Sequence, residues 1–136
     1  MARRGGAAPA PLLKIDRVLV ATAVSWLGLW AHELHRVPGL IGFTPDGDLF
    51  MLPIVAGLAI WWNRSNGILA ACALAIYAAV NLAGAMLSVL PLGLLPFVPE
   101  QSLAHYTAHV IYAGSQLPLL ILTIFRLQRR PDRKRS

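Results

Sequence analysis

The chain has 136 residues, which is enough for one domain. Hydrophobic residues make up 57% of the chain and charged residues only 13%, against roughly 25% charged residues in soluble domains. With a mean hydropathy of +0.60, this composition excludes an ordinary soluble domain. The single cysteine, Cys72, excludes an intrachain disulfide. The net charge of +6 is high, but the positions of the charges argue against nucleic acid as a partner.

Residues 1–16 are rich in Arg, Gly, Ala and Pro, and we expect them to be a disordered basic segment in the cytoplasm. The first apolar segment predicts a membrane-spanning helix over residues 17–35, close to the length that a bilayer requires. The segment ends in Trp-Leu-Gly-Leu-Trp-Ala-His-Glu and lacks the small-x-small cleavage pattern of a signal peptide. We therefore expect this helix to be retained.

The second predicted helix covers residues 45–62 and has a clear start signal. Thr44 provides a hydroxyl N-cap, and Pro45 suits the first helical position. At the other end, Trp61 and Trp62 stand where an aromatic belt is expected in a membrane protein.

The third predicted helix covers residues 67–90 and follows a short polar turn. Three prolines between residues 91 and 99 cannot continue a helix, so this segment is either a plain connector or a lid. The fourth helix is predicted over residues 99–127 and completes a four-helix domain spanning residues 17–127. Residues 128–136 form a basic cytoplasmic tail.

Four spans place both termini on one side of the membrane, and the charges select that side. Eleven of the twelve Lys and Arg residues lie in the terminal segments and in the turn before the third helix, whereas the opposite side carries Arg36 alone. The positive-inside rule then predicts that both termini are cytoplasmic. We expect an all-α, antiparallel four-helix bundle that is integral to the cell (plasma) membrane. Its basic tails should contact anionic lipids of the cytoplasmic leaflet rather than nucleic acid.

Polar residues recur at helical spacing on three of the predicted helices, and they should face the bundle interior because polar groups in lipid are costly. The second predicted helix has only Pro53 and Gly57 and is expected to pack as a wall. The polar faces consist of Ser25, Gly28, His32 and His35, of Tyr77, Asn81, Gly84 and Ser88, and of Ser102, His105, His109, Tyr112 and Gln116.

All four histidines lie at the predicted non-cytoplasmic ends of the first and last helices. At about 1.5 Å per residue, His32 and His109 come out at one level, about 8–9 Å below the outer edge of the hydrocarbon core. His35 and His105 lie one turn nearer the surface. Imidazole is the commonest transition-metal ligand, and facing helices of a bundle often carry such sites. We predict a Zn, Cu or Fe centre held by these four histidines, in a polar pocket that opens outward.

Two carboxylates and three further polar residues accompany this predicted centre. Glu33 and Glu100 could serve as acid/base groups or as additional metal ligands, although Glu33 is turned by about 100° from His32 on the helix. Asn81 and Gln116 equally suit hydrogen bonds between helices. The candidates for cofactor contacts are Asn81, Tyr112 and Gln116.

Two alternatives use the same residues, and a further one is non-catalytic. His32 and His109 could be the axial ligands of a haem b, or the histidines could exchange protons with a quinol beside Tyr106 or Tyr112, as in an electron-transfer subunit. The chain could instead be a non-catalytic accessory subunit of a larger membrane complex, or form a homo-oligomer. The spacing suits redox, hydrolytic and metal-handling chemistry alike, so the sequence leaves open whether the protein is an enzyme.

Overall fold

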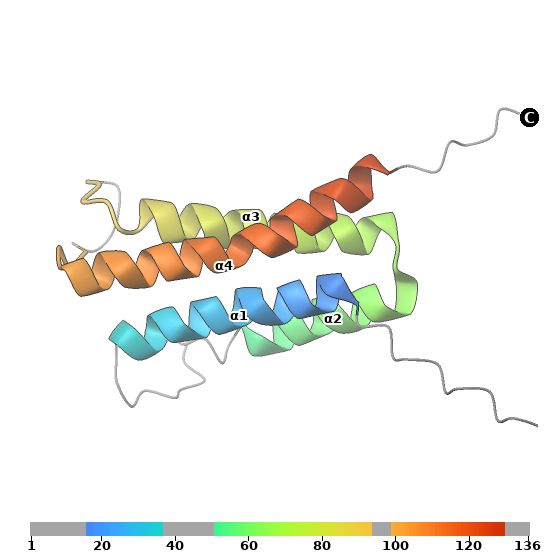
Figure 1. Ribbon diagram of the computed structural model, residues 1–136, viewed down its shortest axis with the longest axis horizontal. Helices are drawn as coiled ribbons and strands as arrows, with labels where there is room; N and C mark the ends of the chain where they lie inside the picture. Colours follow the sequence, from blue (N-terminus) through green and yellow to red (C-terminus); the bar gives the residue numbers. More distant parts are fainter. Residues whose placement is uncertain (1–15, 37–50, 94–98, 130–136) are drawn as a thin grey trace, which may run out of the picture.

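The computed structural model describes residues 16–36, 51–93 and 99–129, apart from the side chains of residues 34–36. These residues form an antiparallel bundle of four helices, and no strand occurs among them (Figure 1). The predicted all-α class is therefore confirmed. The helices are α1 (Arg17–Arg36), α2 (Leu52–Ser65), α3 (Ile68–Leu87) and α4 (Leu103–Gln128).

Helix α1 begins at the predicted residue because Asp16 caps it. The Oδ1 atom of Asp16 accepts a hydrogen bond of 2.8 Å from the N–H of Val18, as an N-cap side chain does. The indole N–H of Trp62 donates to the other carboxylate oxygen at 2.9 Å, which ties the start of α1 to the end of α2. Trp62 is consequently buried, which corrects its predicted place in an aromatic belt, whereas Trp61 is exposed.

The turn between α2 and α3 lies at the same end of the bundle as the start of α1 and the end of α4. Asn66 closes α2 in the left-handed conformation (φ 43°), and its N–H donates to the carbonyl of Trp62 at 2.7 Å. The Arg126 guanidinium, near the end of α4, donates to the backbone and side-chain oxygens of Asn66 at 3.2 and 3.3 Å. The predicted start of the second helix at Pro45 lies outside the described residues, and its described part begins at Leu52.

Two predicted boundaries on the opposite end of the bundle need correction. Helix α3 ends at Leu87 rather than at residue 90. Helix α4 begins at Leu103 rather than at residue 99, because Ser102 is its N-cap. The Ser102 hydroxyl oxygen accepts a hydrogen bond of 3.2 Å from the N–H of His105.

Helix α4 is the central element, since it packs along both α1 and α3, whereas α2 makes smaller contacts with α1 and α3 (Figure 1). The larger apolar core lies toward the end of the bundle where the described chain starts and finishes. It includes Val18, Val55, Trp62, Leu74 and Leu119.

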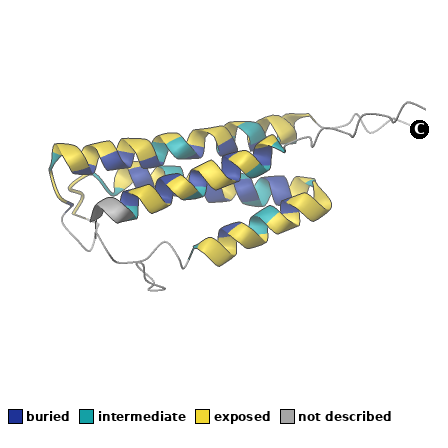
Figure 2. Ribbon diagram, turned by 60° about the horizontal axis from the view of Figure 1, so that its bottom comes forward, coloured by how far each residue is buried: buried dark blue, intermediate teal, exposed yellow. Residues whose placement is uncertain are grey.

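The bundle buries several polar side chains beside its apolar core and exposes many large apolar ones, and its buried positions line the facing sides of the helices (Figure 2). Within the described residues, α3 and α4 are long and apolar enough to cross a membrane. The buried polar residues include Thr22, Ser25, Asn81, Gln116 and Thr123, and the most exposed apolar residues include Leu69, Leu103 and Val110.

Helices α1 and α4 cross most closely at Gly28. A Cβ atom at this position would lie 1.9 Å from Oγ and 2.3 Å from Cβ of Ser115. Beside this crossing, the Ser25 hydroxyl donates to Oε1 of Gln116, and Nε2 of Gln116 donates to the Ser25 carbonyl at 3.1 Å. The absence of a side chain at Gly28 therefore permits the approach that these hydrogen bonds require.

We predict that Gly28→Ala lowers the free energy of unfolding by about 1–3 kcal/mol, because the added methyl group overlaps Ser115. Thermal unfolding followed by circular dichroism measures this change. Gly84→Ala is the matched control, since a Cβ at Gly84 meets nothing within 4 Å. The control should be neutral or stabilising by up to about 1 kcal/mol. Equal effects of the two substitutions would contradict a tight crossing at Gly28.

Candidate functional site

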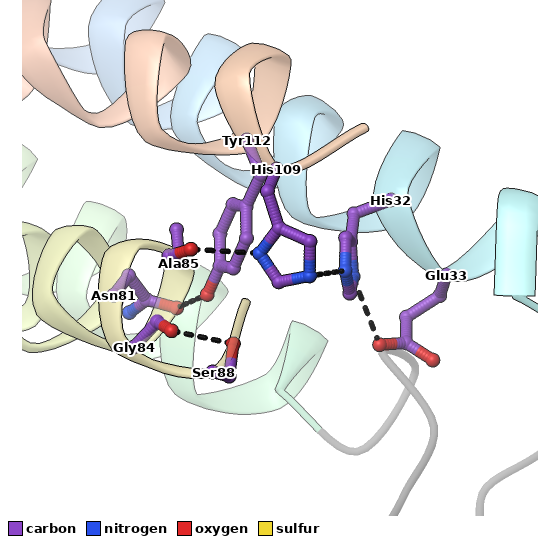
Figure 3. Close-up of polar contacts among 8 residues, drawn as sticks. All are labelled: His32, Glu33, Asn81, Gly84, Ala85, Ser88, His109 and Tyr112. Atoms are coloured by element: carbon purple, nitrogen blue, oxygen red, sulfur yellow. Dashed lines mark hydrogen bonds and ion pairs between the residues drawn. The ribbon is translucent and has the colours of Figure 1, made fainter. Parts of the chain in front are cut away.

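Two buried imidazole rings join α1 to α4 in the half of the bundle away from the Asp16–Trp62 contact (Figure 3). Their Nε2 atoms, from His32 and His109, are 3.0 Å apart, and the ring centroids are 4.4 Å apart. The two residues are only 7% and 5% exposed. The structure thus brings together the two histidines that the sequence places at one level.

The end of α3 determines the proton position on His109. Nδ1 of this ring is 2.7 Å from the carbonyl oxygen of Ala85 (Figure 3). Ala85 is among the last four residues of α3, whose carbonyl groups have no partner within the helix. A carbonyl oxygen only accepts hydrogen bonds, so Nδ1 carries the proton. In the neutral ring, Nε2 of His109 therefore presents a lone pair toward His32.

Glu33 determines the proton position on His32 in the same way. Its Oε1 atom is 3.3 Å from Nδ1 of His32, and its side chain is 21% exposed. The side chain thus reaches back to its neighbour, although the helical offset predicted divergent directions. When the carboxylate is ionised it only accepts hydrogen bonds, so Nδ1 of His32 carries the proton. Nε2 of a neutral His32 ring is then also a lone-pair atom.

Two facing lone pairs at 3.0 Å repel each other, so this contact suits either a proton shared in an Nε2–H···Nε2 hydrogen bond or a metal ion bound by both nitrogens. Two nitrogen ligands at about 2.0–2.1 Å from one zinc ion stand about 2.8–3.4 Å apart for angles of about 90–110°. The observed separation of His32 and His109 falls in this range. Metal-binding histidines typically direct their second nitrogen to a carboxylate or a backbone carbonyl, as both rings do here.

The other two predicted metal ligands stand differently toward this pair. His105 is buried, and its ring centroid is 4.4 Å from that of His109 and 6.4 Å from that of His32. The side chain of His35 lies outside the described residues. In the described part of the chain, no group of three or more His, Cys, Asp or Glu residues is arranged to hold a metal ion. The four-histidine centre therefore stays a prediction, and the described pair is His32 with His109.

Beside the pair, Tyr112 and Asn81 connect α4 to α3 (Figure 3). The Tyr112 hydroxyl donates to Oδ1 of Asn81 at 2.6 Å, and Nδ2 of Asn81 donates to the carbonyl of Tyr77 at 2.8 Å. The Tyr112 ring centroid is 5.3 Å from that of His32. These two predicted cofactor contacts thus form one wall of the histidine site and hold its helices together.

Three other predicted positions lie away from the histidine pair. Gln116 is fully buried and bonded to Ser25, so its contacts match the alternative role of joining helices. Glu100 is exposed and makes no hydrogen bond or ion pair with any described residue. Gly84 is exposed and Ser88 only partly buried, with the Ser88 hydroxyl donating to the carbonyl of Gly84 at 2.6 Å, so the inward face of α3 passes through Asn81 and Ala85 and leaves these two residues outside it.

Two residues that make contacts at or near the site were not predicted from the sequence. The carbonyl of Ala85 orients His109, but a backbone acceptor has no signature in the residue type. Ser115, which contacts the Gly28 backbone region and accepts a hydrogen bond of 3.0 Å from Nε2 of Gln116, was not singled out. Its position next to Gln116, on a helix already predicted to face α1, was the available signal.

Comparisons with known protein families, with curated proteins and with solved structures find no match to this chain.

We predict that Tyr112→Phe lowers the free energy of unfolding by about 1–2 kcal/mol, because it leaves the buried Oδ1 of Asn81 without its donor. Tyr106→Phe is the matched control, since the Tyr106 hydroxyl bonds to Gln101 in an exposed position where water can replace it. The control should change stability by less than about 0.5 kcal/mol. Denaturant titration of both variants measures the difference, and equal losses would contradict a structural role for the Tyr112–Asn81 bond.

Proposed function

We propose that this chain is a multi-pass protein of the cell membrane that binds a transition-metal ion near its non-cytoplasmic face. Its outward apolar surface and the lengths of α3 and α4 support membrane embedding. The basic residues Arg17, Arg64, Arg126 and Arg129 all belong to the end of the bundle that carries the α2–α3 turn. This end then faces the cytoplasm and its anionic lipids, and the histidine pair lies toward the opposite face.

The observation that carries the metal assignment is the contact between the two Nε2 atoms. Both rings have their Nδ1 atoms at acceptors, and their Nε2 atoms face each other at 3.0 Å. A divalent ion relieves the repulsion between two lone pairs and uses both as ligands, with imidazole selecting Zn, Cu or Fe. Haem b is less well supported, since axial nitrogens on opposite sides of one metal stand about 4 Å apart at such bond lengths.

Two protein ligands would leave coordination positions open for water, substrate or a further side chain, whereas structural zinc sites are closed by four protein ligands. The bound metal would supply Lewis-acid or redox chemistry between two buried imidazole rings. Glu33 is placed to hold the Nδ1 proton of His32 and so to orient that ring. Asn81 and Tyr112 fix the floor of the site.

The orientation predicts that reporters fused to either terminus are active only if they function in the cytoplasm. A cytoplasmic fluorescent reporter should be bright at both ends, and an exported phosphatase reporter should be inactive at both ends. Moving the phosphatase to the segment between α1 and α2 is the matched control, because that segment follows one span and should be exported. Phosphatase activity at either terminus would contradict the orientation.

The metal proposal predicts that the purified protein binds close to one Zn²⁺ or Cu²⁺ per chain, and that the double variant His32→Ala/His109→Ala loses this binding. Elemental analysis after dialysis measures the content. His105→Ala is the comparison variant, because its ring packs edge-on against His109 without lying between the two Nε2 atoms; loss of binding in this variant too would add His105 to the site. An unchanged metal content in the double variant would show that the pair is not the site.

Glu33 and Glu100 allow a matched test of whether the carboxylate beside His32 supports metal binding. Glu33→Gln removes the negatively charged acceptor at Nδ1 of His32 and should weaken metal affinity by about 10–100-fold. Glu100→Gln changes an exposed carboxylate without such a contact and should leave the affinity unchanged. Titration with Zn²⁺ compares the two. Equal affinities in both variants would remove Glu33 from the proposed site.

A further inference from the structure

An apolar groove of about 550 Å³ lies between α3 and α4 on the outer surface of the bundle. Its size falls within the range of about 300–1,000 Å³ that is usual for ligand sites. Its walls include Leu82, Met86, Val110 and Leu117, and the last three are exposed. His109, which belongs to the histidine pair, forms part of the floor. The groove therefore borders the proposed metal site from the side that faces lipid.

The length of the groove and the positions of its polar and apolar ends match one leaflet of a bilayer. Along α4 it extends from Tyr106, near the start of the helix, to Leu117. At about 1.5 Å per residue this distance is about 16 Å, close to half of a hydrocarbon core of about 30 Å. The Tyr106 hydroxyl, bonded to Gln101, provides a polar group at the outer end, and the inner end is apolar. A chain lying in the groove would run from the surface to the middle of the membrane.

We propose that this groove binds one acyl chain of a membrane phospholipid, with the head group at the level of Tyr106. The inference depends on the proposed membrane embedding and extends the proposed function, because it identifies a lipid amphiphile as the class of molecule held beside His109. The lining argues for a flexible hydrocarbon chain, since almost all of its atoms are apolar and its one buried imidazole already has partners at both nitrogens.

Gly114 provides the test. It lines the groove, is exposed, and a Cβ atom there meets nothing within 4 Å. A side chain at Gly114 therefore starts in open space, so Gly114→Leu places bulk in the groove and also favours the helix. Gly57→Leu is the matched control, because Gly57 is exposed on α2 and a Cβ there also meets nothing within 4 Å. The full-length protein is reconstituted in phosphatidylcholine vesicles that contain a trace of phosphatidylglycerol with a photoreactive acyl chain.

After illumination, peptide mapping should place the label on the α3 and α4 residues of the groove. Gly114→Leu should lower this labelling by about tenfold, as expected when a ligand site is filled, and Gly57→Leu should leave it unchanged. Labelling that is spread evenly over all exposed apolar faces, labelling that Gly114→Leu does not reduce, or protection of the groove by a second copy of the chain would each overturn the proposal. Metal content measured on the same variants separates the two proposals, because neither substitution touches His32 or His109.

Discussion

The facing Nε2 atoms of His32 and His109 depend on what holds the far side of each ring. The carbonyl of Ala85 is available to His109 because α3 ends two residues later and leaves this oxygen without a helical partner. Glu33 is available to His32 because it follows directly in the last turns of α1. The chemistry of the site is thus a consequence of where helices end. An extension of α3 by one regular turn would remove the acceptor that orients His109.

Besides the apolar core at one end of the bundle, polar contacts and a close backbone approach join the same helices. Gln116 and Ser25 form two hydrogen bonds between α1 and α4, and Tyr112 with Asn81 does the same between α3 and α4. In the proposed bilayer setting, lipid would offer little hydrophobic advantage for helix association, and packing of small residues and hydrogen bonds would take this role. Gly28, which has no side chain, allows α1 and α4 to approach closely where they cross.

Much of this arrangement was predictable because it follows from periodicity. Helical spacing placed Ser25, His32, Asn81, His109 and Gln116 on inward faces, and all of them are buried. The estimated depths placed His32 and His109 at one level of the bundle, and their rings are in contact. Long-range contacts that depend on side-chain reach were not predictable. Trp62 donates a hydrogen bond to Asp16 instead of standing in an aromatic belt. Helix α4 begins after the Ser102 N-cap, whereas Pro99 had indicated an earlier start.

The central position of α4 has a consequence for biogenesis. During synthesis α1, α2 and α3 emerge first, while the polar faces of α1 and α3 acquire their partners His109, Tyr112 and Gln116 only when the last helix arrives. At translation rates of about 5–20 residues per second, the incomplete chain exists for several seconds. A truncated product that ends before Leu103 would keep those faces unsatisfied permanently, which makes it a natural target for the proteases that remove unassembled chains.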